Sequence, residues 1–234
     1  MPSSGTWMTE FDPGCRRCLR LAGFLEEGRA RHPAYHCAPV APFGDAAPRL
    51  LIVGLAPGFH GANATGRPFT GDYAGVLLYA TLHGFGWATA AVSTSRDDGL
   101  VLTGARITNA VKCVPPANKP TPVEIATCNE FLRAELAGLP QGAVVLALGA
   151  IAHGAVLRAH DVRQSAFRFA HGAEHVLPCG RVLIDSYHCS RYNTNTRRLT
   201  EEMFRAVVGK ASELARGQGT GDRGQQERSL AARR

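Results

Sequence analysis

The sequence predicts an α/β protein, a three-layer sandwich in which a central, mostly parallel sheet is flanked by helices on both faces. Short apolar runs alternate along the chain with longer segments whose apolar residues recur at helical spacing. The runs are apolar at nearly every position, which is typical of strands buried on both faces. Polar loops follow three of the runs, and loops at the carboxyl ends of parallel strands gather at one edge of a sheet.

Four apolar runs give the expected strands, at residues 50–53, 105–111, 143–148 and 181–185. The first is β-branched at Ile52 and Val53 and is followed by turn residues, and the third is apolar throughout. All four are too short for a typical helix, so the sequence predicts strands.

Five segments with helical spacing give the expected helices, at residues 19–31, 74–84, 124–139, 150–160 and 197–214. Thr121 and Pro122 precede the third helix and are typical of a helix start. The second helix is expected to turn Val76, Leu77 and Leu78 inward. The last is expected to bury Leu199, Met203, Val207 and Leu214.

The composition is that of a globular protein with a mild basic excess. The chain has 234 residues, 45% of them hydrophobic, which is enough for one large domain. The net charge of +7 is weak support for a polyanionic partner. We expect a flexible N-terminus at residues 1–14, one domain at residues 15–214 and a disordered basic tail at residues 215–234.

The sequence carries no sign of export or of a membrane span. Its first residues lack the basic start and apolar run of a secretory signal. Its longest apolar stretch, residues 143–152, is too short to cross a bilayer. We therefore expect a cytoplasmic protein that does not bind membranes.

A glycine- and proline-rich loop at residues 54–72 is the first candidate site. It directly follows the first expected strand and carries few polar side chains together with one aromatic ring, Phe69. It lacks the Gly-Lys-Ser/Thr ending of a phosphate loop and the glycine spacing of a dinucleotide fold. A connection of this length is unusual unless it is functional, so we expect a binding or active site here.

A second polar loop, at residues 186–196, follows the last expected strand. His188 stands there among hydroxyl and amide side chains, with three arginines close by in the sequence. This composition suits binding to a phosphate backbone and bases. A polar helix entry with Thr196 as its cap fits the same residues equally well.

Four of the seven cysteines fall into two pairs. Cys15 and Cys18 form a C-x-x-C motif, and Cys113 and Cys128 are separated by fourteen residues. Two such pairs in a cytoplasmic chain suit thiolate coordination of zinc or of an iron–sulfur cluster, and the spacing does not choose between them. The remaining cysteines, Cys37, Cys179 and Cys189, are expected to be small buried residues.

Three motifs occur in order along the chain. The first is Gly54-Leu-Ala-Pro-Gly58 with the run from Thr65 to Asp72, the second is the run from Ile107 to Pro116, and the third is His188-Cys-Ser190 with Asn195-Thr196. Together with the four paired cysteines they resemble the uracil-DNA glycosylase superfamily, and within it the family 5, B-type, iron–sulfur enzymes. The resemblance covers about residues 15–214.

The resemblance implies a DNA repair enzyme that flips a deaminated base out of DNA and hydrolyses its N-glycosidic bond. The implied bases are uracil and, by extension, hypoxanthine or xanthine. The implied partner is DNA that contains these bases, and the protein is expected to be a monomer. The implied cofactor is a [4Fe–4S] cluster on Cys15, Cys18, Cys113 and Cys128. The cluster would bring Lys112 and Lys119 to the sheet edge, where phosphates would bind.

The resemblance also assigns roles to individual residues. Asp72 would act on the sugar cation or the water, Asn109 would read the base edge, and His188 would donate to the departing base. The implied substrate-binding residues are Gly54, Gly58, His60, Gly61, Asn63, Phe69, Ser190 and Asn195, with Phe69 stacking on the flipped base.

Two positions depart from related patterns. Family 4 enzymes have an acidic residue after the first glycine, where this chain has Leu55, and this favours family 5. Cys189 stands where many relatives have proline. Three alternatives stay open: a family 4-like enzyme specific for uracil, a non-catalytic nucleic-acid-binding module held by zinc, and an iron–sulfur electron carrier. The presence of Phe69, Asp72, Asn109 and His188 speaks against both non-enzymes.

Overall fold

A six-stranded sheet forms the centre of the molecule in the computed structural model, which describes residues 11–217. The strand order is β1-β3-β2-β4-β6-β5. The strands are β1 (Phe43–Gly44), β2 (Leu50–Gly54), β3 (Ala105–Asn109), β4 (Val144–Leu148), β5 (Glu174–Val176) and β6 (Val182–Ser186). The four inner strands are parallel, and the short edge strands β1 and β5 are antiparallel to their neighbours.

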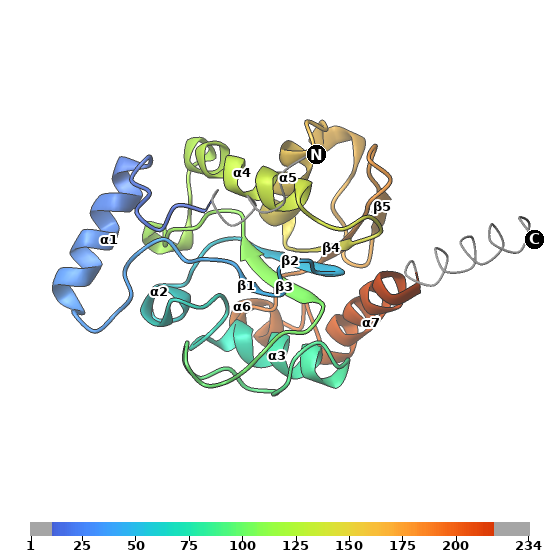
Figure 1. Cartoon of the computed structure of the whole chain (residues 1–234), viewed down its shortest axis with the longest axis horizontal. Helices are drawn as coiled ribbons and strands as arrows, with labels where there is room; N and C mark the ends of the chain where they lie inside the picture. Colours follow the sequence, from blue (N-terminus) through green and yellow to red (C-terminus); the bar gives the residue numbers. More distant parts are fainter. Residues whose placement is uncertain (1–10, 218–234) are drawn as a thin grey trace, which may run out of the picture.

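Helices cover both faces of this sheet, as Figure 1 shows. The longer helices are α1 (Leu19–Arg31), α3 (Tyr73–Gly84), α4 (Pro122–Ala137), α5 (Ala150–Ala159) and α7 (Glu201–Gly217). The short ones are α2 (Ala62–Thr65), α6 (Arg191–Asn195), η2 (Pro116–Asn118) and η3 (Gln164–Ala166). Helices α3 and α7 lie on one face and α4 and α5 on the other, so the predicted three-layer α/β sandwich is confirmed.

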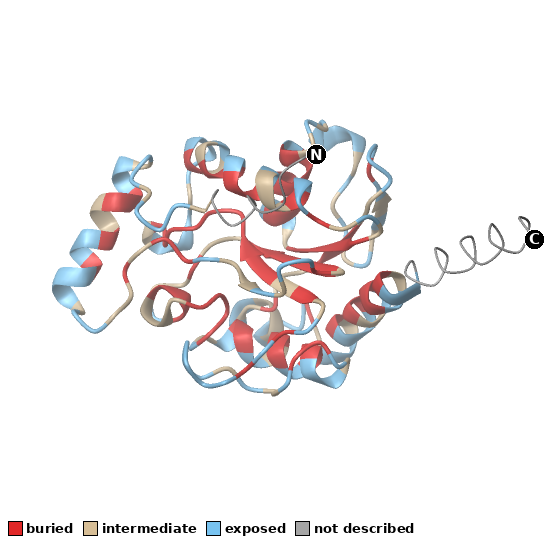
Figure 2. Cartoon of the chain, viewed as in Figure 1, coloured by how far each residue is buried: buried red, intermediate tan, exposed pale blue. Residues whose placement is uncertain are grey.

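The core follows the alternation of side chains along each strand. Leu50 and Ile52 of β2 point to the α3/α7 face, whereas Leu51 and Val53 point to the α4/α5 face. All four are fully buried, which explains why the inner strands read as continuous apolar runs. Figure 2 shows the buried sheet between helices whose outer faces are exposed.

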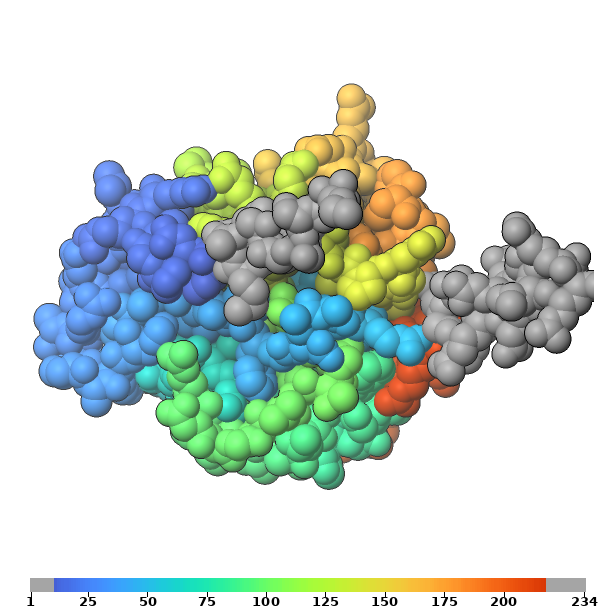
Figure 3. All heavy atoms as spheres, viewed as in Figure 1, coloured from blue at the N-terminus to red at the C-terminus, as the bar shows by residue number. Residues whose placement is uncertain are grey.

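Helix α1 lies at one end of the sandwich instead of in either layer. Leu21 and Leu25 pack with Cys113 and Phe131 in a separate small core. Figure 3 shows this N-terminal part of the chain against α4 at one end of the molecule. A bidentate ion pair between the Arg20 guanidinium and the Glu124 carboxylate fastens α1 to the first turn of α4.

Some details of the helices confirm the predictions from sequence, and others show that a prediction was wrong. Thr121 caps α4 in a capping box, as predicted from its position. Val76 is wrong as an inward residue, because its side chain is 62% exposed on the outer face of α3, whereas Leu78 is buried. The last helix begins at Glu201, later than predicted, because Arg197, with φ of 55°, is not helical.

The termini and the membrane question complete the description of the fold. Residues 1–10 and 218–234, which include most of the expected flexible terminus and basic tail, lie outside the described residues. Within residues 11–217, no helix has the length and apolarity needed to cross a membrane.

Candidate functional site

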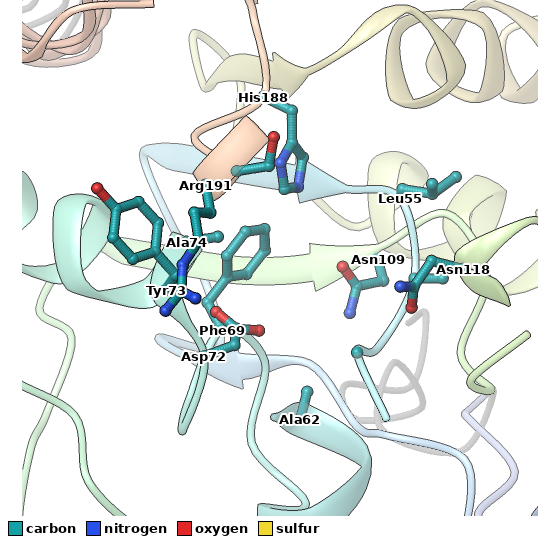
Figure 4. A pocket seen from close by; sticks show the side chains of 13 residues that line it. Leu55, Ala62, Phe69, Asp72, Tyr73, Ala74, Asn109, Asn118, His188 and Arg191 are labelled. Carbon is teal, nitrogen blue, oxygen red and sulfur yellow. The ribbon is translucent and has the colours of Figure 1, made fainter. Parts of the chain in front are cut away.

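A cavity of about 370 Å³ opens at the carboxyl edge of the parallel strands. Its lining comes from loops that follow β2, β3 and β6, as expected for a parallel sheet. Phe69, Asp72, Asn109 and His188 all line it, so the structure brings together the four residues with the most specific predicted roles (Figure 4).

Phe69 presents an aromatic surface in this cavity. Its backbone is left-handed, with φ of 54°, a conformation that a bulky residue adopts only when its surroundings impose it. The Phe69 ring lies 5.8 Å from the His188 ring, centroid to centroid, with an angle of 27° between the planes. A Cβ on Gly54 would lie 2.7 Å from the Phe69 ring, so glycine is needed there for the ring to sit where it does.

Asn109 is the last residue of β3 and pairs with Gly54 across the sheet. Its side chain is 3% exposed, and its Oδ1 is buried without a hydrogen-bond partner among the described residues. Figure 4 shows the amide pointing into the space beside Phe69. A buried carbonyl oxygen without a donor is costly, so this oxygen is available to a donor on a bound molecule.

His188 lies just beyond the end of β6, and its side chain lines the cavity. Burial lowers its pKa to about 4, so the imidazole is neutral near pH 7. The backbone around it is held by Asn193, whose Nδ2 donates to the His188 carbonyl oxygen over 2.8 Å. Ser190 caps α6 with its hydroxyl, so this loop is fixed by local hydrogen bonds.

Asp72 is both a helix cap and part of the cavity lining. Its Oδ1 accepts a hydrogen bond from the Gly75 N–H over 2.9 Å at the start of α3. Its Oδ2 faces Gly58 and Gly61. Burial raises the pKa of the Asp72 carboxyl, and hydrogen bonds from the backbone N–H groups of Gly75 and Ala74 oppose this shift only in part.

The other predicted binding residues divide into two groups. Gly58 and Ser190 line the cavity. Gly54, His60, Gly61, Asn63 and Asn195 do not line it. His60 is exposed and hydrogen-bonds to the Tyr35 hydroxyl, whereas Asn63 is buried and donates to the Phe59 carbonyl oxygen.

Three further polar residues line the cavity without an individual role assigned from sequence: Tyr73, Asn118 and Arg191. Asn118 has a left-handed backbone, with φ of 55°, next to Ala117 in the same conformation. Such backbone strain often marks functional loops. The only sequence signal for these residues is their place beside a motif.

The four paired cysteines meet in a second, smaller cavity beside α1. Cys15, Cys18, Cys113 and Cys128 line it together with apolar side chains. The Lys112 backbone N–H donates to Cys128 Sγ over 3.2 Å. Burial and the three other cysteines raise the pKa of the Cys113 thiol to about 12. Since four thiolates there need a cation to neutralise them, these residues fit a thiolate-bound metal centre.

The three remaining cysteines do not line this cavity. Cys37 and Cys189 are buried as expected, but Cys179 is exposed, so that expectation was wrong for it.

The prediction that Lys112 lies where DNA phosphates would bind is wrong. Its side chain is 1% exposed and contacts Thr108 and Glu135, so it cannot reach a phosphate. The Lys112 ammonium is buried together with the Glu135 carboxylate, because burying the ammonium alone would cost too much desolvation free energy.

Two histidines converge on the buried Asp185 carboxylate, an arrangement that the sequence did not predict. His153 Nδ1 lies 2.7 Å from Asp185 Oδ1, and His175 Nε2 lies 2.9 Å from Asp185 Oδ2. Burial opposes protonation of His153, but the hydrogen bond and charge of Asp185 outweigh it and raise the His153 pKa. These hydrogen bonds join α5, β5 and β6 just before the segment that carries His188.

Comparisons with known proteins agree with the motifs. Residues 41–211 match the family model of the uracil DNA glycosylase superfamily. A type-5 uracil-DNA glycosylase of Thermus thermophilus is 48% identical over 206 residues, which cover 86% of this chain and 94% of that protein. Another, from Pyrobaculum aerophilum, is 42% identical over 202 residues, covering 85% and 88%.

The chain is also similar to a solved structure of Pedobacter heparinus SMUG2. It matches with a TM-score of 0.44 and 15% identity, covering 76% of this chain and 78% of that one.

Proposed function

The chain belongs to the uracil DNA glycosylase superfamily and to its type 5 enzymes, and on that premise we propose that it removes uracil from DNA by hydrolysing the N-glycosidic bond. The reaction would start base excision repair. The observation that carries the proposal is the cavity in which Phe69, Asn109, His188 and Asp72 face one space.

The cavity suits a flipped pyrimidine. A volume of about 370 Å³ is ample for one base, and the Phe69 ring offers it a stacking surface. The Asn109 amide carries one acceptor and one donor side by side, which matches the N3–H and O4 of uracil. The support for this role is the buried Oδ1, which lacks a partner until a donor such as N3–H arrives.

His188 is proposed to stabilise the departing base. As the glycosidic bond breaks, negative charge develops on the uracil ring and its O2. A neutral imidazole keeps one N–H to donate to that oxygen, and a pKa of about 4 keeps His188 neutral at physiological pH. One preorganised donor of this kind contributes about 3–4 kcal/mol in well-studied active sites.

Asp72 is proposed to act on the sugar side, where positive charge develops and water attacks. It supplies the only carboxylate among the described residues that line the cavity. Because Oδ1 caps α3, Oδ2 is the oxygen that would face the sugar or the water. The helix-capping role and the catalytic role are therefore compatible.

We further propose that the enzyme accepts hypoxanthine or xanthine besides uracil. Leu55 lines the cavity where family 4 enzymes carry an acid, so this wall contributes no polar group that would restrict the base. Without that acid, catalysis would depend more on leaving-group stabilisation. A uracil-only enzyme of the family 4 kind is the alternative.

The four clustered cysteines are proposed to hold a [4Fe–4S] cluster, with zinc as the alternative. When bound, the cluster would supply a covalent cross-link between the N-terminal segment, the loop after β3 and α4. The residues around it are mostly apolar, apart from Arg17, Lys112 and Thr127, which fits a structural role. We also propose a monomer that works in the cytoplasm.

A strand-nicking assay, in which alkali cleaves the DNA at each abasic site, tests the function. Duplexes carrying uracil, hypoxanthine or xanthine would be incubated with wild-type protein, Asn109→Ala and the control Val123→Ala, whose side chain is 73% exposed on α4. Wild type and control should release uracil at equal single-turnover rates, and Asn109→Ala should be slower by about 10- to 100-fold. If wild-type protein that contains its metal centre releases no base, the proposal fails.

A further inference from the structure

A third cavity, of about 390 Å³, lies next to the base cavity. It is a groove between the outer face of α3 and the segment that joins α6 to α7. Tyr73 lines both cavities, so its side chain stands between them. The groove is therefore adjacent to the candidate active site.

Tyr73 is well placed as a divider. Its side chain is 41% exposed, and the Arg191 guanidinium lies 5.1 Å from the centre of its ring. Figure 4 shows the two side chains together at one side of the base cavity. A cation over one face holds the ring in place without burying the whole of it.

The groove is apolar along α3 and polar along its other wall. Val76 is 62% exposed there, next to Leu77 and Ala80. Together with the Tyr73 ring, these side chains give the groove one continuous apolar wall. The opposite wall carries Thr194 and Arg197.

Arg197 adds a cation and a strained backbone to this wall. Its φ is 55°, a left-handed conformation that arginine adopts only when the chain around it requires it. The hydrogen bond from the Leu199 N–H to the Asn193 carbonyl oxygen closes the turn around it. The groove also contains one acid, Glu201, at the start of α7.

A nucleotide combines the features that this groove would complement, a flat apolar base and an anionic phosphate. We propose that the groove binds the nucleotide that flanks the target base in the same DNA strand, with its base against Tyr73 and Val76 and its phosphate near Arg197. The inference rests on the proposed function, because it extends the base cavity along the strand. It predicts that Tyr73 contacts two neighbouring nucleotides.

Binding to short single strands tests the groove. Uracil would be placed at the centre, at the 5′ end or at the 3′ end of otherwise identical oligonucleotides, and Kd would be measured for wild type, Val76→Glu and Arg197→Gln. Val123→Glu is the matched control, since Val123 is also an exposed valine, on α4. Neither valine is buried, so neither change should affect folding.

Wild type should bind about tenfold more weakly when the flank on one particular side of the uracil is missing. Val76→Glu should bind the central-uracil strand about tenfold more weakly and lose nothing more when that flank is removed. Arg197→Gln should lower the dependence of log K on log salt by about one ion. The control Val123→Glu should bind and excise as the wild type does.

Two results would contradict the proposal that the groove binds the flanking nucleotide. One is a Val76→Glu protein that binds all strands as the Val123→Glu control does. The other is a wild-type protein that is indifferent to loss of either flank. A wild type that excises uracil neither from these strands nor from a duplex would instead refute the proposed function, and the binding results would still decide the groove.

Discussion

Gly61 and Asp72 lie so close that a Cβ on Gly61 would stand 2.7 Å from Oδ2 of the Asp72 carboxylate. Real Cβ atoms do not approach oxygen that closely, so any side chain at residue 61 must displace the carboxylate or its loop. Gly61 does not line the base cavity itself. Its contribution is to leave space for Asp72 to be both helix cap and active-site carboxylate.

Replacing Gly61 by alanine should therefore slow chemistry more than it weakens DNA binding. A displacement of about 1 Å in a catalytic group can reduce rate about 100-fold, and we expect a loss of that order in single-turnover uracil excision. The affinity for uracil-containing duplex should change little. Gly23→Ala is the control, because a Cβ there meets nothing within 4 Å. Equal rates for the two variants would show that Gly61 does not position Asp72.

The pH dependence of excision should report Asp72. Burial raises the pKa of this carboxyl above its ordinary value, and only the ionised form can stabilise the sugar cation. The rate should therefore fall as pH decreases through the raised pKa. His188 stays neutral until about pH 4, so its protonation should matter only at lower pH. Single-turnover rates from pH 4.5 to 8 would measure this limb.

Asp72→Asn provides the check on that assignment. The amide keeps the shape of the side chain but has no proton to lose in this range. The variant should be slow and its residual rate should be nearly independent of pH. If the acid limb persists unchanged in Asp72→Asn, another group controls it.

The strands and the main site residues could be predicted from sequence because each depends on local pattern. β2 and β4 are apolar at almost every position, and Phe69, Asn109 and His188 belong to recognisable motifs. The edge strands β1 and β5 are only two and three residues long and partly exposed, so they leave no periodic signal.

Long-range pairing explains what the sequence did not reveal. Arg67 belongs to the first motif, yet its buried guanidinium pairs with Asp98, at 2.7 Å, and donates to Ser93. It therefore fastens two loops instead of facing DNA. The buried pairing of Lys112 with Glu135, across 23 residues of sequence, was hidden in the same way. Neither partner could be identified without the fold.

The clustered cysteines should control both colour and stability. Cys18→Ala and Cys113→Ala should each lose most of the bound iron and visible absorbance, because four thiolates are needed to hold the cluster. They should also unfold at lower temperature, since the centre cross-links α1 to α4. Cys179→Ala, which changes an exposed thiol, should keep both properties, and Cys37→Ala should keep the iron and the colour.

Iron and zinc content per protein chain would decide the nature of the centre. Iron near four atoms per chain supports the [4Fe–4S] assignment, and one zinc with no visible absorbance supports the alternative. If Cys37→Ala loses metal and Cys18→Ala retains it, the ligand set is wrong.

The division of labour between His188 and Asp72 gives the last prediction. His188 should matter most when the leaving base is poor, because its N–H stabilises charge on that base. His188→Ala should therefore lose about 100- to 1,000-fold in single-turnover excision of uracil, and much less for 5-fluorouracil, whose ring carries negative charge more readily. Asp72→Asn should lose similar factors on both, since the sugar cation and the attacking water are common to them. Equal losses for His188→Ala on the two bases would assign it to positioning the base instead of stabilising its departure.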